Sequence, residues 1–241
     1  MYFSSHMANF GTTGGDSASN LIISTFNVNS IGKNPKRQQI FNFLSTKKSD
    51  IFVLVDTRIS KDLEDTVKQE WGSSAYFSCL NSQARGVAIL FKKFVCVEVL
   101  KEKNDPSGNI LFLLLNFDSK KILLTAIYGP NEDNPQFYKE KVFNLIDEWD
   151  PDFAIYAGDW NLVLNQNLDT KNYLHKNNLR ARSELKNKME YFSLIDVWRE
   201  LNPSAKKYTW TGKASRPYKF SRLDFFLISN SLFPFIKKNI H

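Results

Sequence analysis

Short apolar runs separated by turn residues dominate the chain from Leu21 onward. Runs rich in Val, Ile, Leu and Phe with turn residues on both sides predict buried strands, and apolar residues spaced three or four apart predict helices. These patterns predict strands at residues 21–26, 51–55, 86–91, 95–100, 110–116, 122–127, 153–157, 208–210 and 223–228, and helices at residues 36–46, 136–149 and 181–192.

The mixture of strands and helices indicates an α/β fold in which sheets are covered by helices. Short polar links join the consecutive runs between residues 86 and 127, which is typical of an antiparallel meander. The runs at 208–210 and 223–228 are expected to pair with each other. Neither an internal repeat nor an interdomain linker interrupts the pattern, so we predict one domain over residues 21–241.

Residues 1–20 differ from the rest of the chain in composition. They are rich in Gly, Ser, Thr and Asn and lack apolar periodicity, and Ser5, His6 and Met7 resemble the remnant of an expression tag. We therefore expect residues 1–20 to be a disordered leader or tag remnant outside the fold.

Composition narrows the class of protein. Hydrophobic residues make up 42% and aromatic residues 14% of the 241 residues, which excludes wholesale disorder. The formal net charge of +7 suits a polyanionic partner such as nucleic acid, although a surface of solvated lysines gives the same value. The two cysteines, Cys79 and Cys96, form no metal-binding or disulfide pattern, and no apolar run reaches membrane-spanning length. We expect an intracellular protein without a membrane anchor.

Polar residues lie at the ends of several predicted strands. Hydrolysis of a phosphodiester needs an activated water, a stabilised transition state and a neutralised leaving oxygen, and a divalent metal held by carboxylates supplies much of this. Strand ends position such groups on a rigid scaffold. Turns also favour Asn and Asp for local backbone reasons, so one such residue alone indicates little. The residues at these ends are Asn27, Asp56, Tyr128, Asp159, Asn161 and Asp224.

Five motifs resemble, in order, those of apurinic/apyrimidinic-type endonucleases, and most closely those of the endonuclease domain of non-LTR (LINE-type) retrotransposons. They are Thr25-Phe26-Asn27-Val28-Asn29-Ser30, Asp56-Thr57-Arg58, Ile127-Tyr128-Gly129-Pro130-Asn131, Gly158-Asp159-Trp160-Asn161-Leu162-Val163 and Ser221-Arg222-Leu223-Asp224-Phe225-Phe226-Leu227. The stretches at 84–90, 196–203 and 208–210 also look like retrotransposon proteins rather than repair enzymes. The resemblance extends from Leu21 to the end of the chain. It implies the endonuclease/exonuclease/phosphatase superfamily, whose fold is a four-layer α/β sandwich of two mainly antiparallel sheets flanked by helices, as in deoxyribonuclease I.

The resemblance implies catalytic roles for three of the strand-end residues. Asp159 would orient or deprotonate the attacking water, and Asn161 would hold that water or the scissile phosphate. Tyr128 would donate its hydroxyl to a phosphate oxygen. The structural alternatives are a Gly-Asp turn for Asp159 and an aromatic ring packed on the sheet edge for Tyr128.

The resemblance also implies a metal site and a histidine partner. Asp56 would be the principal ligand of Mg²⁺, or of Mn²⁺, and Asn27 would contact the metal or a phosphate unless it is a turn residue. Asp224 would act in catalysis by orienting a histidine and stabilising its positive charge. A salt bridge from Asp224 to Arg222 is the structural alternative.

The chain departs from the family pattern at two places. The family usually has Glu at the position of Asp56, so the shorter side chain is expected to weaken metal binding without abolishing it. The family also ends with a Ser-Asp-His motif that does not occur here, so we expect the domain to stop before its last strand. His6, His175 and His241 are poor substitutes for that histidine by their positions in the sequence.

Aromatic and basic residues alternate near the predicted hairpin. Thr209 and Trp210, followed by basic residues as far as Arg222, could probe a DNA groove and hold phosphates, or form a solvated hairpin around a buried Trp. Asn131, at the end of its motif, is also predicted to contact DNA. Lys36, with Lys33 and Arg37, could contact backbone phosphates or form a plain helix surface.

The leading hypothesis is a nuclease that nicks double-stranded DNA and leaves a 3′-hydroxyl for target-primed reverse transcription. By resemblance we expect it to act in the nucleus, as a monomeric domain, with a reverse transcriptase in the same parent polyprotein. A catalytically impaired DNA-binding remnant is one alternative, favoured by the two departures. A phosphatase of the same superfamily is another, disfavoured by the retrotransposon-like stretches.

Overall fold

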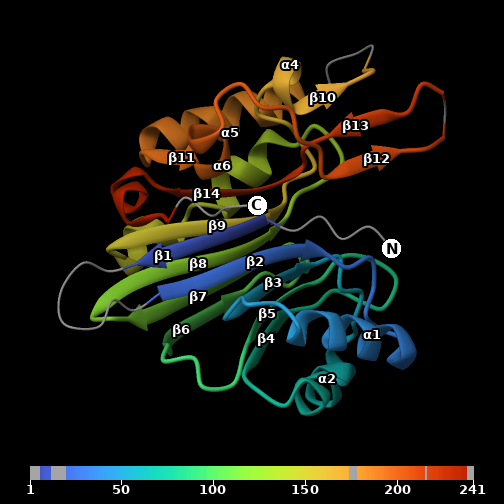
Figure 1. Ribbon diagram of the computed structural model, residues 1–241, viewed down its shortest axis with the longest axis vertical. Coiled ribbons are helices and arrows are strands. Elements are labelled where there is room, and N and C mark those ends of the chain that lie inside the picture. Colours follow the sequence, from blue (N-terminus) through green and yellow to red (C-terminus); the bar gives the residue numbers. More distant parts are fainter. Residues whose placement is uncertain (1–5, 12–19, 174–177, 215, 238–241) are drawn as a thin grey trace.

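Two large sheets pack face to face, helices cover their outer faces, and a small third sheet extends from one end (Figure 1). The computed structural model describes residues 6–11, 20–173, 178–214 and 216–237, and for residues 6–11 it describes the backbone alone. None of the helices in these ranges is long and apolar enough to span a membrane.

Residues 6–91 form the first large sheet and its helices. The elements are β1 (His6–Gly11), β2 (Asn20–Asn27), α1 (Asn34–Ser45), β3 (Ile51–Val55), η1 (Lys61–Leu63), α2 (Glu64–Trp71), β4 (Ala75–Ser78) and β5 (Val87–Phe91). The strand order is β1-β2-β3-β5-β4, with β2 and β3 parallel and the other neighbours antiparallel. Both faces of β3 are covered, so all five of its residues are apolar and buried.

Most of the second large sheet and its helices lie between residues 98 and 235. The elements are β6 (Glu98–Asn104), β7 (Ile110–Phe117), β8 (Lys120–Tyr128), the π-helical turn η2 (Phe137–Lys141), α3 (Leu145–Trp149), β9 (Phe153–Asp159), α5 (Leu179–Tyr191), β11 (Leu194–Asp196), α6 (Val197–Leu201), β14 (Asp224–Ser229) and η3 (Asn230–Phe235). The strand order is β11-β14-β9-β8-β7-β6, and only the β8–β9 pair among these strands is parallel.

Apolar side chains fill three spaces between layers. Alternate residues of β3, such as Val53, pack against residues of the second sheet such as Leu124. The intervening residues, such as Phe52, pack against the α1 and α2 side. On the far side of the second sheet, residues such as Tyr156 pack against Leu185 of α5 and against η2 and α3. The predicted four-layer sandwich of two mainly antiparallel sheets is confirmed.

The third sheet corrects the predicted strand pairing near the carboxyl end. Its strands are β10 (Thr170–Lys171), β12 (Trp210–Gly212) and β13 (Lys219–Ser221), in the order β10-β13-β12. The short helix α4 (Gln166–Asp169) directly precedes β10. The prediction that 208–210 pairs with 223–228 is wrong, because β12 pairs with β13 while β14 pairs with β9 and β11. Arg222 lies between β13 and β14, where the chain passes from the third sheet to the second, and its side chain pairs with the buried carboxylates of Asp169 and Asp196.

Three further patterns differ from the structure. The predicted meander over 86–127 is shorter, because β5 belongs to the first sheet and only β6, β7 and β8 follow one another. β6 begins later than predicted and includes polar residues, since one side of this edge strand is open to solvent. The predicted helix over 136–149 is divided into η2 and α3, and the neighbours Phe137 and Tyr138 are both buried, which a helix with one apolar stripe does not predict.

The amino-terminal stretch also differs in part from its expectation. Residues 6–11, which composition placed outside the fold, form β1 and pair antiparallel with β2. Backbone pairing at a sheet edge satisfies N–H and C=O groups without an apolar side-chain pattern, so composition does not reveal it. Residues 1–5 and 12–19 lie outside the described part of the chain.

Candidate active site

The polar residues at the strand ends meet at one edge of the sandwich. β2 and β3 run parallel in the first sheet, and β8 and β9 run parallel in the second, so their carboxyl ends lie side by side in pairs. β14 runs antiparallel to β9 and begins where β9 ends. The edge therefore carries Asn27 at the end of β2, Asp56 directly after β3, Tyr128 at the end of β8, Asp159 at the end of β9 and Asp224 at the start of β14.

Asp159 lies at the centre of this edge and connects the two sheets. Asn27 Nδ2 in the first sheet donates to Asp159 Oδ2 in the second at 3.0 Å, and the backbone N–H of Asn161 donates to Asp159 Oδ1 at 2.9 Å. Burial raises the pKa of Asp159, the hydrogen bonds from Asn161 and Asn27 oppose this rise, and the charge of Asp56 adds to it. Two carboxylates thus lie close enough to repel each other.

Close approach between β8 and β9 brings their ends into this arrangement. Gly158 has φ 148°, and a Cβ there would lie 1.9 Å from the carbonyl oxygen of Ile127. A Cβ on Gly129 would lie 2.3 Å from the carbonyl oxygen of Trp160. Only glycine fits at either position, because any larger residue would push the two strand ends apart.

Tyr128 and Asn161 border the same space. Tyr128 is half-buried and packs against the core between the sheets. Burial raises its pKa to about 12, with further contributions from the charges of Asp56 and Asp159, so its hydroxyl stays protonated and able to donate at neutral pH. Asn161 has left-handed φ 50°, and its Nδ2 donates to the carbonyl oxygen of Gly129 at 2.7 Å. Both side chains are thereby fixed beside Asp159.

Asp56 is buried and already neutralised by an arginine. Arg58 Nε donates to Asp56 Oδ1 at 2.9 Å, and Arg58 Nη2 donates to Asp56 Oδ2 at 2.8 Å. Both residues have left-handed backbone, with φ 58° at Asp56 and φ 48° at Arg58. This turn brings two side chains together that lie two positions apart in the sequence.

Comparison with known proteins agrees with this geometry. No protein-family model matches the sequence. A Xenopus laevis protein described as transposon TX1 uncharacterized 149 kDa protein is 30% identical over 216 residues, which are 88% of this chain and 16% of that protein. An AP endonuclease from Archaeoglobus fulgidus superposes with a TM-score of 0.65 at 20% identity, covering 89% of this chain and 88% of the other. The endonuclease domain of TRAS1, a telomere-specific non-LTR retrotransposon, superposes with a TM-score of 0.61 at 15% identity, covering 87% and 85%.

The chain has the fold of this AP endonuclease and of the TRAS1 endonuclease domain, and its sequence is similar to part of a transposon protein. Its similarity to AP endonucleases and to a retrotransposon endonuclease domain, predicted from the motifs, is confirmed. The chain spans about one sixth of the length of its transposon relative.

The oxygen atoms at this site suit a hard divalent cation. The Asp56 carboxylate and the Asn27 amide oxygen are ligand types that Mg²⁺ accepts, and a cation would relieve the repulsion between Asp56 and Asp159. Both oxygens of Asp56, however, accept from Arg58, and Asn27 Oδ1 accepts from the backbone N–H of Asn29 at 3.1 Å. Among the residues described, no three His, Cys, Asp or Glu side chains gather to hold a metal. A cation binding Asp56 would meet the guanidinium of Arg58 beside both carboxylate oxygens.

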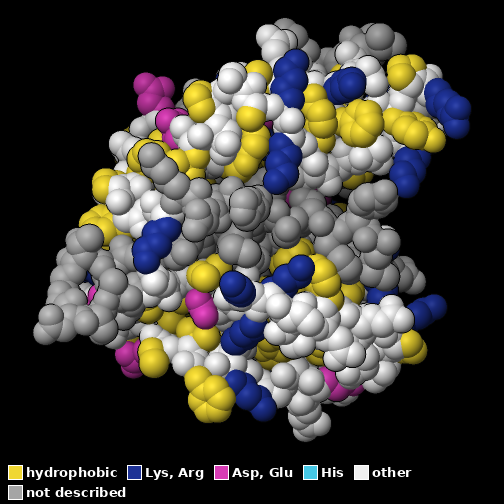
Figure 2. Space-filling model, viewed as in Figure 1, with side chains coloured by type: hydrophobic (Ala, Val, Ile, Leu, Met, Phe, Trp, Pro, Cys, Tyr) yellow, Lys and Arg dark blue, Asp and Glu magenta, His cyan; other side chains and the backbone are white. Residues whose placement is uncertain are grey.

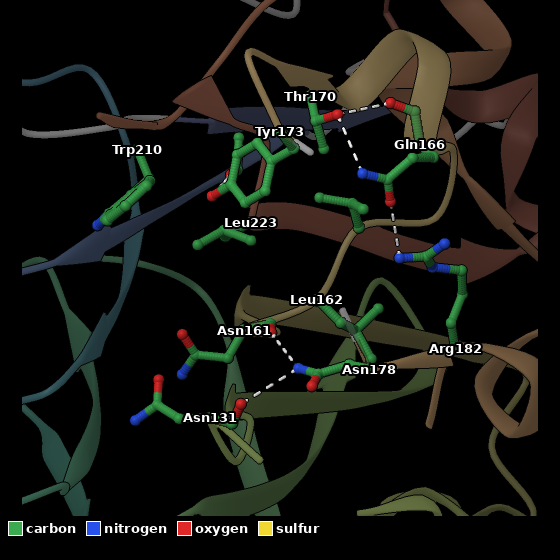
Figure 3. Close-up of a pocket in the computed structure, with 12 residues that line it drawn as sticks. Asn131, Asn161, Leu162, Gln166, Thr170, Tyr173, Asn178, Arg182, Trp210 and Leu223 are labelled. Atoms are coloured by element: carbon green, nitrogen blue, oxygen red, sulfur yellow. Dashed lines mark hydrogen bonds between the residues drawn. The ribbon is translucent and has the colours of Figure 1, made fainter. Parts of the chain in front are cut away.

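Two cavities flank the site and meet at Asn131. The hairpin pocket, of about 230 Å³, lies between β12, α4 and the loop after β9 (Figure 3). Trp210, Tyr173 and Leu223 lie on one side of it, and Asn161 and Asn131 lie on another. The Arg58 pocket, of about 270 Å³, is lined by Asp56, Arg58, Gln83, Ala84, Arg85, Asn109, Tyr128, Gly129, Pro130, Asn131 and Glu132.

Two basic residues predicted to contact DNA have structural roles instead. Arg222 is fully buried and donates to Asp169 and Asp196, so the prediction that it binds DNA is wrong. Arg37 is also buried and pairs with Glu70 at 2.6 Å, so it cannot contact phosphates. Because sequence patterns count charges without locating them, buried ion pairs were mistaken for a basic surface.

The remaining predicted contacts stay near the site. Trp210 is 43% exposed and lines the hairpin pocket. Thr209 Oγ1 accepts from the backbone N–H groups of Leu223 and Asp224, so it also holds the start of β14. The ammonium of Lys36 donates to the carbonyl oxygen of Asn29, and burial followed by the charge of Arg58 lowers its pKa, which places it beside Arg58.

Asp224 is buried opposite Asp159. The salt bridge to Arg222 considered for it does not form, since Arg222 pairs with Asp169 and Asp196. His175 and His241 lie outside the described residues, and the side chain of His6 is not described. A histidine partner for Asp224 therefore stays a prediction.

The sequence reasoning missed several residues at the site. Arg58 was part of a quoted motif, but no sequence pattern predicts that a left-handed turn directs it onto Asp56. Tyr173 and Arg182 line the hairpin pocket and come from segments read as loop and as polar helix. Their only sequence signal was a polar, aromatic-containing stretch after the motif with Asp159.

Proposed function

We propose that this domain hydrolyses a phosphodiester bond in one strand of double-stranded DNA, with Mg²⁺ or Mn²⁺ as cofactor. The observation that carries this proposal is the hydrogen bond between Asn27 and Asp159, because it joins polar groups from both sheets into one site. The relation to a transposon protein supports a nick that leaves a 3′-hydroxyl, from which a reverse transcriptase elsewhere in the parent protein would prime synthesis. The domain would act in the nucleus and as a monomer.

The arrangement assigns a task to each residue. A metal held by Asp56 and Asn27 would neutralise charge on the scissile phosphate and the leaving oxygen. Asp159, fixed on both oxygens by hydrogen bonds, would accept a proton from the attacking water. Tyr128 would donate its hydroxyl to a phosphate oxygen, and the second hydrogen of Asn161 Nδ2 would hold the water or the phosphate. Asp224, opposite Asp159, would orient a histidine, as the motif resemblance implies.

The third sheet provides the surface for DNA. Lys and Arg side chains lie among apolar side chains on the upper part of the molecule, where Figure 1 places β10, β12 and β13 (Figure 2). Trp210 is exposed there, and Lys219 of β13 and Lys171 of β10 belong to the same sheet. Lysines grip the phosphate backbone and an aromatic ring contacts bases or sugars, so this arm would position the strand over the edge that holds Asp159.

Nicking of supercoiled plasmid with added Mg²⁺ tests the proposal. The intact chain is expected to convert supercoiled to open-circular DNA, and Asp159→Asn is expected to lower the rate by about a thousandfold, as loss of a general base does. Asp152→Asn is the matched control, because Asp152 lies at the opposite end of β9 and binds the backbone N–H of Lys121. Equal nicking by both variants would trace the activity to another site or to a contaminant.

Binding of DNA without cleavage is the second candidate function. The bidentate ion pair between Arg58 and Asp56 favours it, because the predicted metal ligand is already occupied. A chain that retards a DNA duplex in a gel, yet nicks no plasmid with Mg²⁺ or Mn²⁺, would establish this function in place of the endonuclease.

A further inference from the structure

We propose that Arg58 is a built-in competitor of the divalent cation, so that its guanidinium and the metal occupy the Asp56 carboxylate in alternation. The proposal rests on the proposed function, because it takes Asp56 as the metal ligand. It adds a residue that controls when the site can bind metal.

The contact between Arg58 and Asp56 gives both carboxylate oxygens a donor from the same cationic group. Each oxygen accepts one N–H from the same planar guanidinium, at 2.9 and 2.8 Å. This bidentate geometry is the strongest that an arginine and a carboxylate form, and it places a positive charge against both carboxylate oxygens. Arg58 and the metal therefore exclude each other.

The exposures show which partner can move. The Asp56 side chain is 6% exposed, whereas the Arg58 side chain is 36% exposed. Backbone hydrogen bonds fix both residues: the carbonyl oxygen of Asp56 accepts from Ser30 N, and Arg58 N donates to the carbonyl oxygen of Arg85. Exchange thus requires only a rotation of the Arg58 side chain while the carboxylate stays in place.

The surroundings of Arg58 offer the guanidinium a second position. The Arg58 pocket, of about 270 Å³, opens beside it and has polar walls that include Gln83 and Tyr128. Arg85 and Glu132 also line this pocket, so it holds a positive and a negative side chain besides Arg58 and Asp56. A DNA phosphate entering the pocket would attract Arg58 away from Asp56 and release the carboxylate.

This exchange predicts coupling between DNA and metal. If DNA withdraws Arg58, the metal binds more tightly with DNA present, and by linkage DNA binds more tightly with metal present. Without DNA, the chain would bind divalent cations weakly and would be protected from metal-dependent chemistry in the absence of substrate.

Titration of the folded chain with Mn²⁺, followed by electron paramagnetic resonance of the free ion, tests the proposal without an activity assay. Arg58→Gln is expected to bind Mn²⁺ about tenfold more tightly than the intact chain, because the competing charge is gone. Arg85→Gln is the matched control, since Arg85 lines the same pocket but donates to Asn109 rather than to Asp56. A DNA duplex should strengthen Mn²⁺ binding to the intact chain and have little effect on Arg58→Gln.

Three results separate the possible failures. Unchanged Mn²⁺ affinity in Arg58→Gln, with binding lost in Asp56→Asn, would overturn the competition and leave the metal site intact. An equal gain in Mn²⁺ affinity in Arg58→Gln and Arg85→Gln would show that any lost positive charge has the same effect, and would also overturn the competition at Asp56. Mn²⁺ binding that survives Asp56→Asn would instead refute Asp56 as ligand, and with it the metal site in the proposed function. If Arg58→Gln unfolds by circular dichroism, Arg58→Lys keeps the charge with a single contact, and about threefold tighter binding is then expected.

Discussion

Replacing Arg222 by Met removes the charge at the centre of a buried ion-pair cluster. Arg222 donates to Asp169 at 2.8 and 3.2 Å and to Asp196 at 3.3 and 2.5 Å, and all three side chains are at most 5% exposed. Asp169 keeps a second partner, Arg199, at 2.6 Å, whereas Asp196 loses its only ion-pair partner among the described residues. Removing one partner of a buried pair costs about 3–5 kcal/mol of the free energy of unfolding.

Thermal unfolding followed by circular dichroism at pH 7 measures this loss. For a domain of this size, each kcal/mol lost from the free energy of unfolding lowers the Tm by about 2–4 °C, so Arg222→Met is expected to lower the Tm by about 6–20 °C. Arg180→Met is the matched control, because Arg180 pairs with Asp133 at 3.2 Å but is 75% exposed. Its loss should stay below about 1 kcal/mol, as for surface ion pairs.

The pH dependence gives a second, independent readout. Burial raises the pKa of Asp169, but the hydrogen bond and charge of Arg222 outweigh it and hold the pKa below its usual value, whereas burial dominates for Asp196 and raises its pKa. A carboxyl group whose pKa is lower in the folded chain than in the unfolded chain stabilises the fold at pH values above its unfolded-state pKa. That stabilisation is lost as the pH falls through the folded-state pKa. Without Arg222, burial raises the pKa values of both Asp169 and Asp196. Protonation then removes their uncompensated negative charges, so the loss in free energy of unfolding relative to the intact chain becomes smaller from pH 7 towards pH 4. A deficit under about 1 kcal/mol at pH 7, or one that does not change with pH, would refute this reasoning.

Three other substitutions test the site and its scaffold. Gly158→Ala should lower the free energy of unfolding by about 3 kcal/mol or more in urea titration, because the new Cβ meets the carbonyl oxygen of Ile127; a loss within the range of an ordinary surface change would contradict the close approach. Tyr128→Phe should slow plasmid nicking about a hundredfold while leaving the Tm nearly unchanged, and an unaltered rate would remove Tyr128 from the mechanism. Lys219→Ala should reduce the slope of log affinity for DNA against log salt by about 1, whereas Trp210→Ala should weaken binding without changing the slope; identical slopes in the two variants would argue against a phosphate contact by Lys219.

Sequence patterns predicted the layers and the strand ends better than the pairing between distant segments. Buried strands such as Ile51–Val55 need apolar residues on both faces, so residue types alone are enough to predict them. Edge strands such as β1 and β6 depend on backbone pairing, which leaves little trace in residue type. The positions of Asn27 and Asp159 at strand ends were predicted from the sequence, whereas their contact depends on how the two sheets pack against each other. The turn of Arg58 onto Asp56 and the burial of Arg222 depend on local backbone and on the neighbours of each charge, which residue types do not specify.

The hydrogen bond between Asn27 and Asp159 also determines when in folding the site can exist. Its two residues are separated by 132 positions, and they belong to sheets formed by different halves of the chain. Residues 20–91 carry Asn27, Asp56 and Arg58, and residues 98–229 carry Tyr128, Asp159 and Asp224. During synthesis the first half emerges before Asp159 exists, and contacts this distant in sequence form late. A nascent or proteolytically cut chain would therefore carry half of the candidate site on each fragment, and the complete site would form only when both halves dock.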